Sequence, residues 1–270
     1  MNLRENKLKK LLKSGGVALG TGLASVRDPD TIYNIAAAGA DFIFIDLEHG
    51  PLNLETAVDL LLHAHAAGIT PMIRIPDLQY AYVTRLLDNG ANCLLLPHVR
   101  EPAEVHRLIE LAKYHPAGRR GWAMGQNGGS NFQNVTDMAA GAAWANDHLL
   151  LGLNIETREA VENLDRMLIP GIDFVIVGFA DLSQSYGFIG QFNHPLVQEA
   201  KTKVRKLCRE RGIFIMDVPF TLDSFKPAIE DGARLLLFGS TIGFVRSGVE
   251  QATRMVKEVR SERTENRKEK

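Results

Sequence analysis

Short apolar runs recur along the chain at wide intervals, and most of them are continuous rather than alternating. Continuous runs rich in Val, Ile and Phe are typical of strands that are buried on both faces, as in a parallel sheet. We therefore predict eight strands, at Val17–Gly20, Phe42–Asp46, Pro71–Ile75, Cys93–Pro97, Leu149–Ile155, Phe174–Gly178, Ile213–Asp217 and Leu235–Gly239.

Helical patterns separate these runs. In Leu54–Ala67 the apolar residues form one stripe at helical spacing, with Asn53 as the predicted N-cap and Gly68 as the C-terminal stop. Arg158–Leu168 has the same character. Strands that alternate with helices in this way predict a single (β/α)₈ barrel over residues 1–270, with a doubly wound parallel sheet as the structural alternative.

Two segments depart from the alternation. Residues 116–134 are rich in Gly and Asn and predict a long loop, and loops of this length are usually functional lids or interface arms. The residues from Arg260 onward are almost all polar or charged, which predicts a frayed, solvated tail. The composition does not change abruptly anywhere along the chain, so we expect one domain.

The composition is that of an ordinary globular protein. Of the 270 residues 45% are hydrophobic and 23% are charged, and the net charge is −1. We expect no binding to nucleic acid or to a membrane, because the chain has no strong positive field and no apolar run of about 20 residues. Residues 1–14 lack the apolar core of a signal peptide. Cys93 and Cys208 fit neither a disulfide framework nor a zinc spacing, which favours a cytoplasmic protein.

Polar residues follow the predicted strands, where the chemistry of a (β/α)₈ barrel is found. They include carboxylates, an arginine and two histidines that we expect to converge on one mouth, namely Asp46, Glu48, His49, Arg74, His98, Asn154, Glu156, Asp181 and Asp217.

Glu156 and Asp181 are the candidate metal ligands. They follow neighbouring strands with no lysine nearby, so their charges would repel unless a divalent cation lay between them. Oxygen ligands of this kind suit Mg²⁺ or Mn²⁺. The alternative is that each caps a helix or pairs with Arg158.

Arg74 and His49 are the candidate catalytic residues. Arg74 lies at the rim of a buried run, where an arginine can hold a carboxylate or a developing enolate oxygen. A structural salt bridge to Asp46 or Glu48 is the alternative. His49 is a candidate general base, either directly or through a metal-bound water.

Several other kinds of chemistry are less well supported. No lysine falls within a predicted strand or at its end, which argues against a Schiff-base enzyme. Gly20-Thr-Gly22-Leu-Ala-Ser25 resembles a dinucleotide-binding turn, but Ser25 replaces its third glycine. Arg119 and Arg120 lie beside glycines in a segment that could cradle an anion, although we expect a mobile lid there.

The strand ends together resemble a known family. The segments are FIFIDLEHGPLN (42–53), PMIRIP (71–76), LLLPHV (94–99), HPAGRRG (115–121), NIETREAVENL (154–164), VGFADLSQSYG (177–187) and HPLVQEA (194–200). In this order they resemble the HpcH/HpaI-type class II pyruvate aldolases, such as 4-hydroxy-2-oxoheptanedioate and 2-keto-3-deoxy-sugar-acid aldolases.

The resemblance implies a (β/α)₈ barrel that assembles as a homo-oligomer, usually a hexamer, and a divalent cation (Mg²⁺, Mn²⁺ or Co²⁺) that binds pyruvate or its enolate. It assigns the metal ligands to Glu156 and Asp181. It also gives catalytic roles to Arg74 and to His49, and makes Asp88 the residue that supports His49.

The substrate-binding segment departs from the family pattern. By resemblance, the backbone of Gly178, Phe179 and Ala180 binds the pyruvate carboxylate, with Phe179-Ala180 in place of the usual Pro-x. Asn154 stands where the family commonly has Gln, and Gly22 stands where an aromatic residue often follows the first strand. The metal ligands are kept, so we expect these changes to affect the choice of substrate.

The resulting prediction is a metal-dependent aldolase. It would cleave or form the carbon–carbon bond of a 4-hydroxy-2-oxo acid, giving pyruvate or a related 2-oxo acid and an aldehyde. Two alternatives remain, an acyl-CoA lyase of the citrate-lyase type and a non-catalytic oligomeric barrel.

Overall fold

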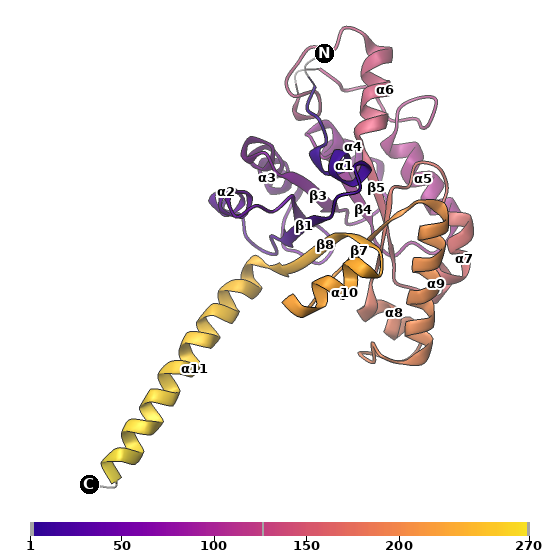
Figure 1. The fold of residues 1–270 in the computed structure, drawn as a ribbon. Helices are drawn as coiled ribbons and strands as arrows, with labels where there is room; N and C mark the ends of the chain where they lie inside the picture. The colour runs from indigo at the N-terminus through magenta and orange to yellow at the C-terminus, as the bar shows by residue number, and fades with distance from the viewer. Residues whose placement is uncertain (1–2, 126, 269–270) are drawn as a thin grey trace.

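Eight parallel strands close into a barrel in the order β1 to β8 (Figure 1). The computed structural model describes residues 3–125 and 127–268. The strands are β1 Ala18–Gly22, β2 Phe42–Asp46, β3 Thr70–Arg74, β4 Cys93–Leu96, β5 Leu150–Ile155, β6 Phe174–Val177, β7 Phe214–Asp217 and β8 Ala233–Ser240. Closure between β1 and β8 excludes the doubly wound sheet and confirms the single (β/α)₈ barrel.

Helices alternate with the strands and surround most of the barrel. They are α1 Lys7–Lys13, α2 Asp30–Ala37, α3 Leu54–Ala67, α4 Tyr80–Asp88, α5 Pro102–Ala112, α6 Met138–His148, α7 Arg158–Met167, α8 Phe179–Ser185, α9 Pro195–Arg211, α10 Phe225–Glu230 and α11 Thr241–Lys268, with short 3₁₀ turns η1 Gly128–Ser130 and η2 Leu222–Ser224.

Local signals define α3 as expected. The Asn53 side chain accepts a hydrogen bond from the Thr56 N–H, and Gly68 ends the helix in the left-handed region at φ 75°. The buried residues of α3 are its predicted apolar stripe, and they pack on the barrel. In this helix the sequence pattern determines both ends and the buried face.

The barrel separates two cores. Phe42, Met72 and Phe174 fill the interior, while Ile43 and Ile73 point outward to the helices. Gly20, in the segment that resembles a dinucleotide-binding turn, belongs to this packing, because a Cβ at Gly20 would lie 2.3 Å from the Phe42 ring. Gly20 is therefore explained without a nucleotide.

Helix α1 closes the amino end of the barrel. Leu8 and Leu12 join the interior core, and Lys9 reaches inward to Asp173, with 3.0 Å between Nζ and Oδ1. Lys9 also donates to the Leu149 carbonyl at 2.8 Å. This buried lysine lies at the end opposite the strand carboxyl termini, so it is not a Schiff-base candidate.

The long loop does not cover the barrel mouth. Residues 116–134 connect α5 to α6, before β5, and therefore lie at the amino end of the barrel. A Cβ at Gly128 or Gly129 would meet the backbone of residues 87–89 at the end of α4, at 2.5 and 2.6 Å respectively. The expectation of a lid at the mouth was wrong, because the segment joins α5 to α6 after the chain has returned to the amino end and before β5 begins.

The C-terminal region is helical up to the end of the described residues. Helix α11 continues to Lys268 and extends away from the barrel as a single long helix (Figure 1). Within the described ranges, no helix combines the length and hydropathy needed to cross a membrane.

Candidate active site at the carboxyl ends of the strands

Four strand ends bring the charged residues together. Asp46 ends β2 and pairs in register with Arg74, which ends β3. Glu156 follows β5 directly, and the loop after β4 carries His98. All these side chains lie at one mouth of the barrel, where substrates meet a (β/α)₈ enzyme.

Arg74 is held in place by two carboxylates. Its Nε and Nη2 donate to the two oxygens of Asp46 at 2.9 and 2.5 Å, and its Nη1 lies 3.0 Å from Oε2 of Glu48. Burial alone would raise the pKa of Asp46, but hydrogen bonds and charge from Arg74 lower it. Burial would likewise lower the pKa of Arg74, and the paired acids raise it. Arg74 therefore does form the salt bridges to Asp46 and Glu48 that were the structural alternative. These contacts still leave some of its five guanidinium N–H groups free for a ligand.

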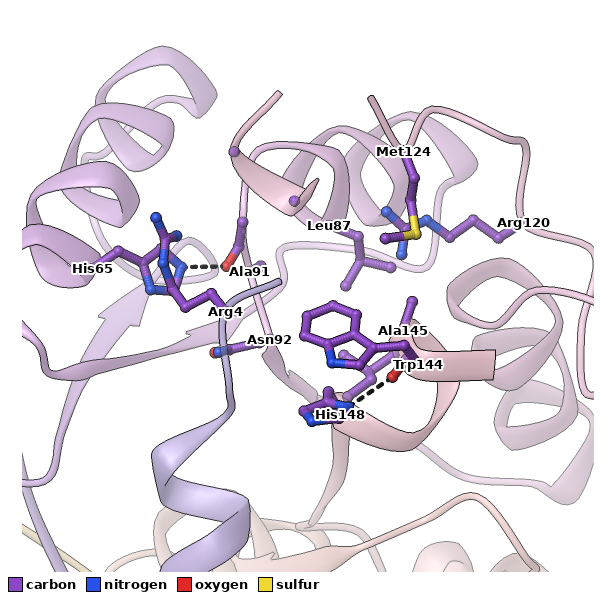
Figure 2. A pocket seen from close by; sticks show the side chains of 14 residues that line it. Arg4, His65, Leu87, Ala91, Asn92, Arg120, Met124, Trp144, Ala145 and His148 are labelled. Atoms are coloured by element: carbon purple, nitrogen blue, oxygen red, sulfur yellow. Dashed lines mark hydrogen bonds between the residues drawn. The ribbon is translucent and has the colours of Figure 1, made fainter. Parts of the chain in front are cut away.

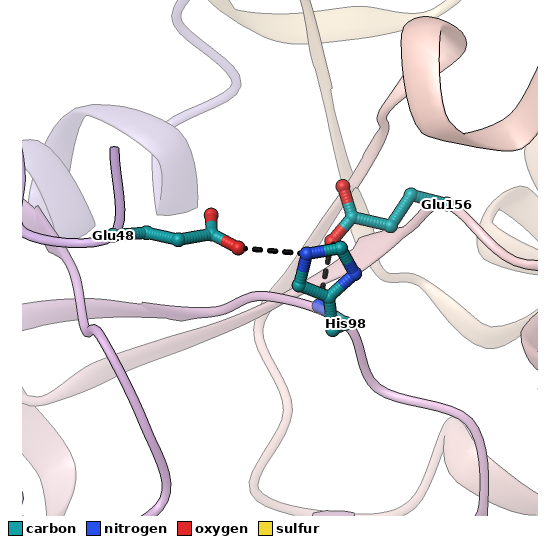
Figure 3. Close-up of side chains that lie close together, drawn as sticks. All are labelled: Glu48, His98 and Glu156. Atoms are coloured by element: carbon teal, nitrogen blue, oxygen red, sulfur yellow. Dashed lines mark hydrogen bonds and ion pairs between the residues drawn. The ribbon is translucent and has the colours of Figure 1, made fainter. Parts of the chain in front are cut away.

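His98 lies between two glutamates (Figure 3). Its Nε2 is 2.9 Å from Oε1 of Glu48, and its Nδ1 is 3.5 Å from Oε1 of Glu156. The sequence placed Glu48 and His98 at the mouth but gave neither a role. Glu48, His98 and Glu156 come together only when the barrel closes, so no local sequence motif predicts that they are neighbours.

Glu156 is almost fully buried, with 1% of its surface exposed. One oxygen accepts from the His98 backbone N–H at 2.6 Å, and the other accepts from Nδ2 of Asn154 at 2.6 Å. Burial raises the pKa of Glu156, and the charges of Glu48 and Asp181 raise it further against the lowering effect of His98. A buried acid with acidic neighbours is suited to bind a cation.

Position 178 requires glycine, because any larger residue would collide with these side chains. A Cβ at this position would lie 2.6 Å from Oε2 of Glu156 and 2.9 Å from Oδ1 of Asn154. The residue also begins α8, whose first turn carries Asp181. Asp181 therefore reaches the site from the helix after β6 and acts on Glu156 through its charge.

Phe179 and Ala180 differ in their positions. The Phe179 ring packs outward beneath Nζ of Lys201, which is 5.1 Å from the ring centroid. Ala180 is exposed in the first turn of α8. The Phe179 side chain thus belongs to the outer shell of the barrel, and only the backbone of this segment is available to a ligand at the mouth.

The structure does not bring His49 and Asp88 together within one copy. His49 follows β2 at the mouth, with 62% of its side chain exposed and Nε2 3.8 Å from Oε2 of Glu48. Asp88 is the last residue of α4, which returns the chain to the amino end of the barrel. There its Oδ1 lies 2.7 Å from Nη2 of Arg120.

Arg120 belongs to the same far end. It lines a cavity together with Arg4, His65, Trp144 and His148 (Figure 2). Burial and the nearby charge of Arg4 lower the pKa of His65 to about 4. The pair Arg119–Arg120 therefore lies away from the carboxylate cluster.

The residues at the mouth suit a divalent cation. Ligand atoms of Glu48, His98 and Glu156 all lie within 4.8 Å of one another. Oδ1 of Asn154 is buried without a hydrogen-bond partner among the described residues, so the site keeps an unused oxygen as well. Asp181 is half-buried beside this group and is the remaining carboxylate of the expected ligand pair.

Sequence comparison relates the chain to known enzymes. The family described as HpcH/HpaI aldolase/citrate lyase matches residues 24–247. A 4-hydroxy-2-oxo-heptane-1,7-dioate aldolase from Escherichia coli is 34% identical over 77% of this chain and 78% of its own length. The enzyme of the same name from Salmonella paratyphi C (strain RKS4594) is 32% identical, with 91% and 92% covered.

Solved structures agree with the sequence comparison. An HpcH/HpaI aldolase from Desulfitobacterium hafniense DCB-2 superposes with a TM-score of 0.88 and 33% identity over 93% of this chain and 96% of its own. A citrate synthase, SbnG, gives 0.83 and 27% over 93% and 97%. With the barrel and the charged mouth already described, these matches show that the chain is a carbon–carbon lyase belonging to the HpcH/HpaI aldolase/citrate lyase family.

Proposed function

We propose that this enzyme cleaves a 4-hydroxy-2-oxo acid to pyruvate, or a related 2-oxo acid, and an aldehyde, and catalyses the reverse addition. The observation that carries the proposal is the continuous set of charged contacts from Asp46 through Arg74, Glu48 and His98 to Glu156. Such a set can hold both the carboxylate and the keto oxygen of a 2-oxo acid. The names of the relatives make 4-hydroxy-2-oxoheptane-1,7-dioate the first substrate to test.

We assign the cation to Glu156 and Asp181, and we expect Mg²⁺, Mn²⁺ or Co²⁺. A bound divalent cation would supply a positive charge that stabilises the enolate. Glu156 provides a fixed oxygen because its hydrogen bonds from His98 and Asn154 restrict the carboxylate. Asn154 and the backbone of Gly178, Phe179 and Ala180 line the proposed position of the substrate carboxylate.

Arg74 would stabilise charge on the keto oxygen. Its bidentate contact with Asp46 fixes the guanidinium before substrate arrives. Fixed donors aimed at a developing oxyanion lower the barrier without reorganisation during the reaction. This role uses the N–H groups that the two carboxylates leave free.

His49 is the proposed base that removes the proton from the 4-hydroxyl group. Its exposed ring lies at the mouth, where a substrate hydroxyl has access to it. Since Asp88 lies at the amino end of the same barrel, Asp88 can support His49 only from another copy. Coexpressed His49→Asn and Asp88→Asn chains should then recover activity that neither variant has alone, whereas no recovery would remove Asp88 from this role.

We further propose that the protein is a homo-oligomer, a hexamer by analogy with the family. Helix α11 carries apolar residues at alternating spacings of three and four, namely Ile242, Val245, Val249, Ala252, Val256 and Val259. This is the pattern of a helix that packs on another helix. Except for Ala252, which is small, these are among the exposed large apolar side chains of the chain.

The barrel offers a complementary surface. A groove of about 350 Å³ lies beside β1 and β8 and is lined by Leu19, Ile35, Ala38 and Phe238. Helix α11 begins directly after β8, so no loop is available to turn it back over this groove. A second copy of α11 is the occupant that we propose.

The reducing cytoplasm is the proposed location. Cys93 and Cys208 are both buried and neither forms a disulfide. Burial raises the pKa of the Cys208 thiol to about 12, which keeps it protonated and unreactive.

The acyl-CoA alternative has lost its sequence support, because it relied on Arg119 and Arg120 to bind phosphates at the mouth. Arg120 instead pairs with Asp88 at the opposite end. The non-catalytic alternative is disfavoured by the complete set of charged residues at the mouth.

A coupled assay of pyruvate release tests the proposed reaction. A panel of 4-hydroxy-2-oxo acids would be assayed with metal, with EDTA, and after Mg²⁺, Mn²⁺ or Co²⁺ is restored. We expect EDTA to abolish turnover and metal to restore it. Glu156→Gln and Asp181→Asn should lose activity and metal affinity together, while the exposed control Glu159→Gln should keep both. Full turnover after exhaustive chelation would overturn the proposal.

A further inference from the structure

We propose that His98 is a nitrogen ligand of the catalytic cation, bound through Nδ1 beside Glu156. This inference rests on the proposed metal site and extends the expected ligand pair, Glu156 and Asp181, by one side chain. It also predicts a stronger preference for Co²⁺ over Mg²⁺ than a site made only of oxygen ligands would have.

The distances around the ring support direct ligation. Metal–nitrogen and metal–oxygen bonds of about 2.0–2.2 Å place two neighbouring ligand atoms roughly 3 to 3.5 Å apart. Nδ1 of His98 lies 3.5 Å from Oε1 of Glu156. The two atoms therefore already have the separation of adjacent ligands on one ion.

Glu48 orients the imidazole for this role. Its Oε1 lies 2.9 Å from Nε2 of His98, so it can accept the Nε2 proton and leave the Nδ1 lone pair facing Glu156. A carboxylate that holds the far nitrogen of a ligating histidine is a common arrangement in metal sites. Glu48 is itself fixed by Arg74 at 3.0 Å, so we assign it to orientation rather than ligation.

The backbone at His98 is also unusual. Its φ of 49° lies in the left-handed region, which residues other than glycine seldom adopt and which is often found at functional sites. The His98 N–H donates to Oε1 of Glu156 at 2.6 Å. This conformation gives one residue two contacts with the same carboxylate, and it leaves the ring half exposed to the mouth.

A nitrogen ligand changes which metal is favoured. Imidazole binds first-row transition ions well, whereas Mg²⁺ prefers oxygen. We therefore expect this site to prefer Co²⁺ and Mn²⁺ over Mg²⁺. The preference should weaken when the imidazole is replaced, even if the carboxylates still bind metal.

Pulsed electron paramagnetic resonance of the Mn²⁺-loaded protein tests the assignment directly. The wild-type spectrum should show imidazole ¹⁴N coupling, which should disappear in His98→Asn and persist in His49→Gln. Asparagine is the primary replacement because it tolerates a left-handed backbone, and His98→Gln with circular dichroism provides a second check. Competition titrations of His98→Asn should show the Co²⁺-to-Mg²⁺ affinity ratio falling at least about tenfold.

The outcomes separate this inference from the proposed function. Mn²⁺ that binds and supports turnover without ¹⁴N coupling would overturn His98 ligation alone. Coupling that persists in His98→Asn would do the same. If the wild-type protein bound no Mn²⁺, both the ligation and the proposed metal site would be wrong.

Discussion

Arg74 and Glu156 are proposed active-site residues whose surroundings restrict them to one arrangement. Arg74 is bound by Asp46 and Glu48, and Glu156 is bound by His98 and Asn154. Residue type and position at a strand end were enough to select both from the sequence. The place of His98 was not predictable, since it depends on a left-handed backbone and on partners 50 and 58 residues away in the chain.

Replacing Arg74 by lysine should slow the reaction without unfolding the protein. Lysine keeps the charge but loses the planar fork that contacts two carboxylates and a substrate oxygen. We expect a rate loss of at least about 100-fold, with unchanged circular dichroism. Arg100→Lys, at an exposed position in the loop after β4, is the matched control. A near-normal rate in Arg74→Lys would contradict the catalytic role.

Glu156→Gln should stabilise the metal-free protein at neutral pH. Because the pKa of Glu156 is raised in the folded state, its ionised form costs stability above the unfolded pKa of about 4.3. The cost should disappear as the pH falls from neutral toward about 4. Thermal melting in EDTA across this range, beside Glu159→Gln, measures the difference. A melting temperature of Glu156→Gln equal to that of the wild-type protein at every pH would contradict this prediction.

At the level of elements, the sequence pattern located the strands but misplaced the long loop. The order of the helices and strands around that loop decides at which end of the barrel it lies. Strand positions agree within three residues at every end, because buried parallel strands give continuous apolar runs. Segment 116–134 was assigned a lid from its composition alone. Its place between α5 and α6, after β4 and α5 and before β5, puts it at the amino end of the barrel.

Helix α1 provides a test of how the amino end is closed. Lys9→Ala removes the buried partner of Asp173 and leaves a carboxylate unpaired, so the free energy of unfolding should fall by about 3 kcal/mol or more. Lys10→Ala, which breaks an exposed pair with Glu5, should change it by less than about 1 kcal/mol. Denaturant titration at one protein concentration compares the two. Equal losses of unfolding free energy in Lys9→Ala and Lys10→Ala would mean that the buried pair adds no more stability than the exposed one.

For the whole molecule, two exposed apolar surfaces favour assembly into an oligomer. One is the apolar face of α11, and the other is the groove beside β1 and β8. The residues from Arg260 onward were expected to fray because almost all of them are polar or charged. Residues 242–259, which precede that tail, carry apolar side chains at heptad spacing, and this spacing is typical of a packed helix. The proposed homo-oligomer rests on these surfaces, and the proposed number of copies rests on the resemblance to the family.

Light scattering at micromolar concentration should give a multiple of 29.8 kDa. Val249→Asp combined with Val256→Asp should lower the mass, because a charge on the buried face of an interface is costly. Replacing the neighbouring Glu250 and Lys257 by alanine is the control. A fully active monomer would contradict both the oligomer and the role given to Asp88.

The direct junction between β8 and α11 has a consequence for how the protein matures. In the proposed assembly, the barrel is complete within one chain, whereas its last helix finds its groove only on a second chain. Maturation should therefore be a second-order process whose half-time shortens as the chain becomes more abundant. In pulse-chase proteolysis of dilute samples, α11 should be removed first, and raising the concentration should protect it.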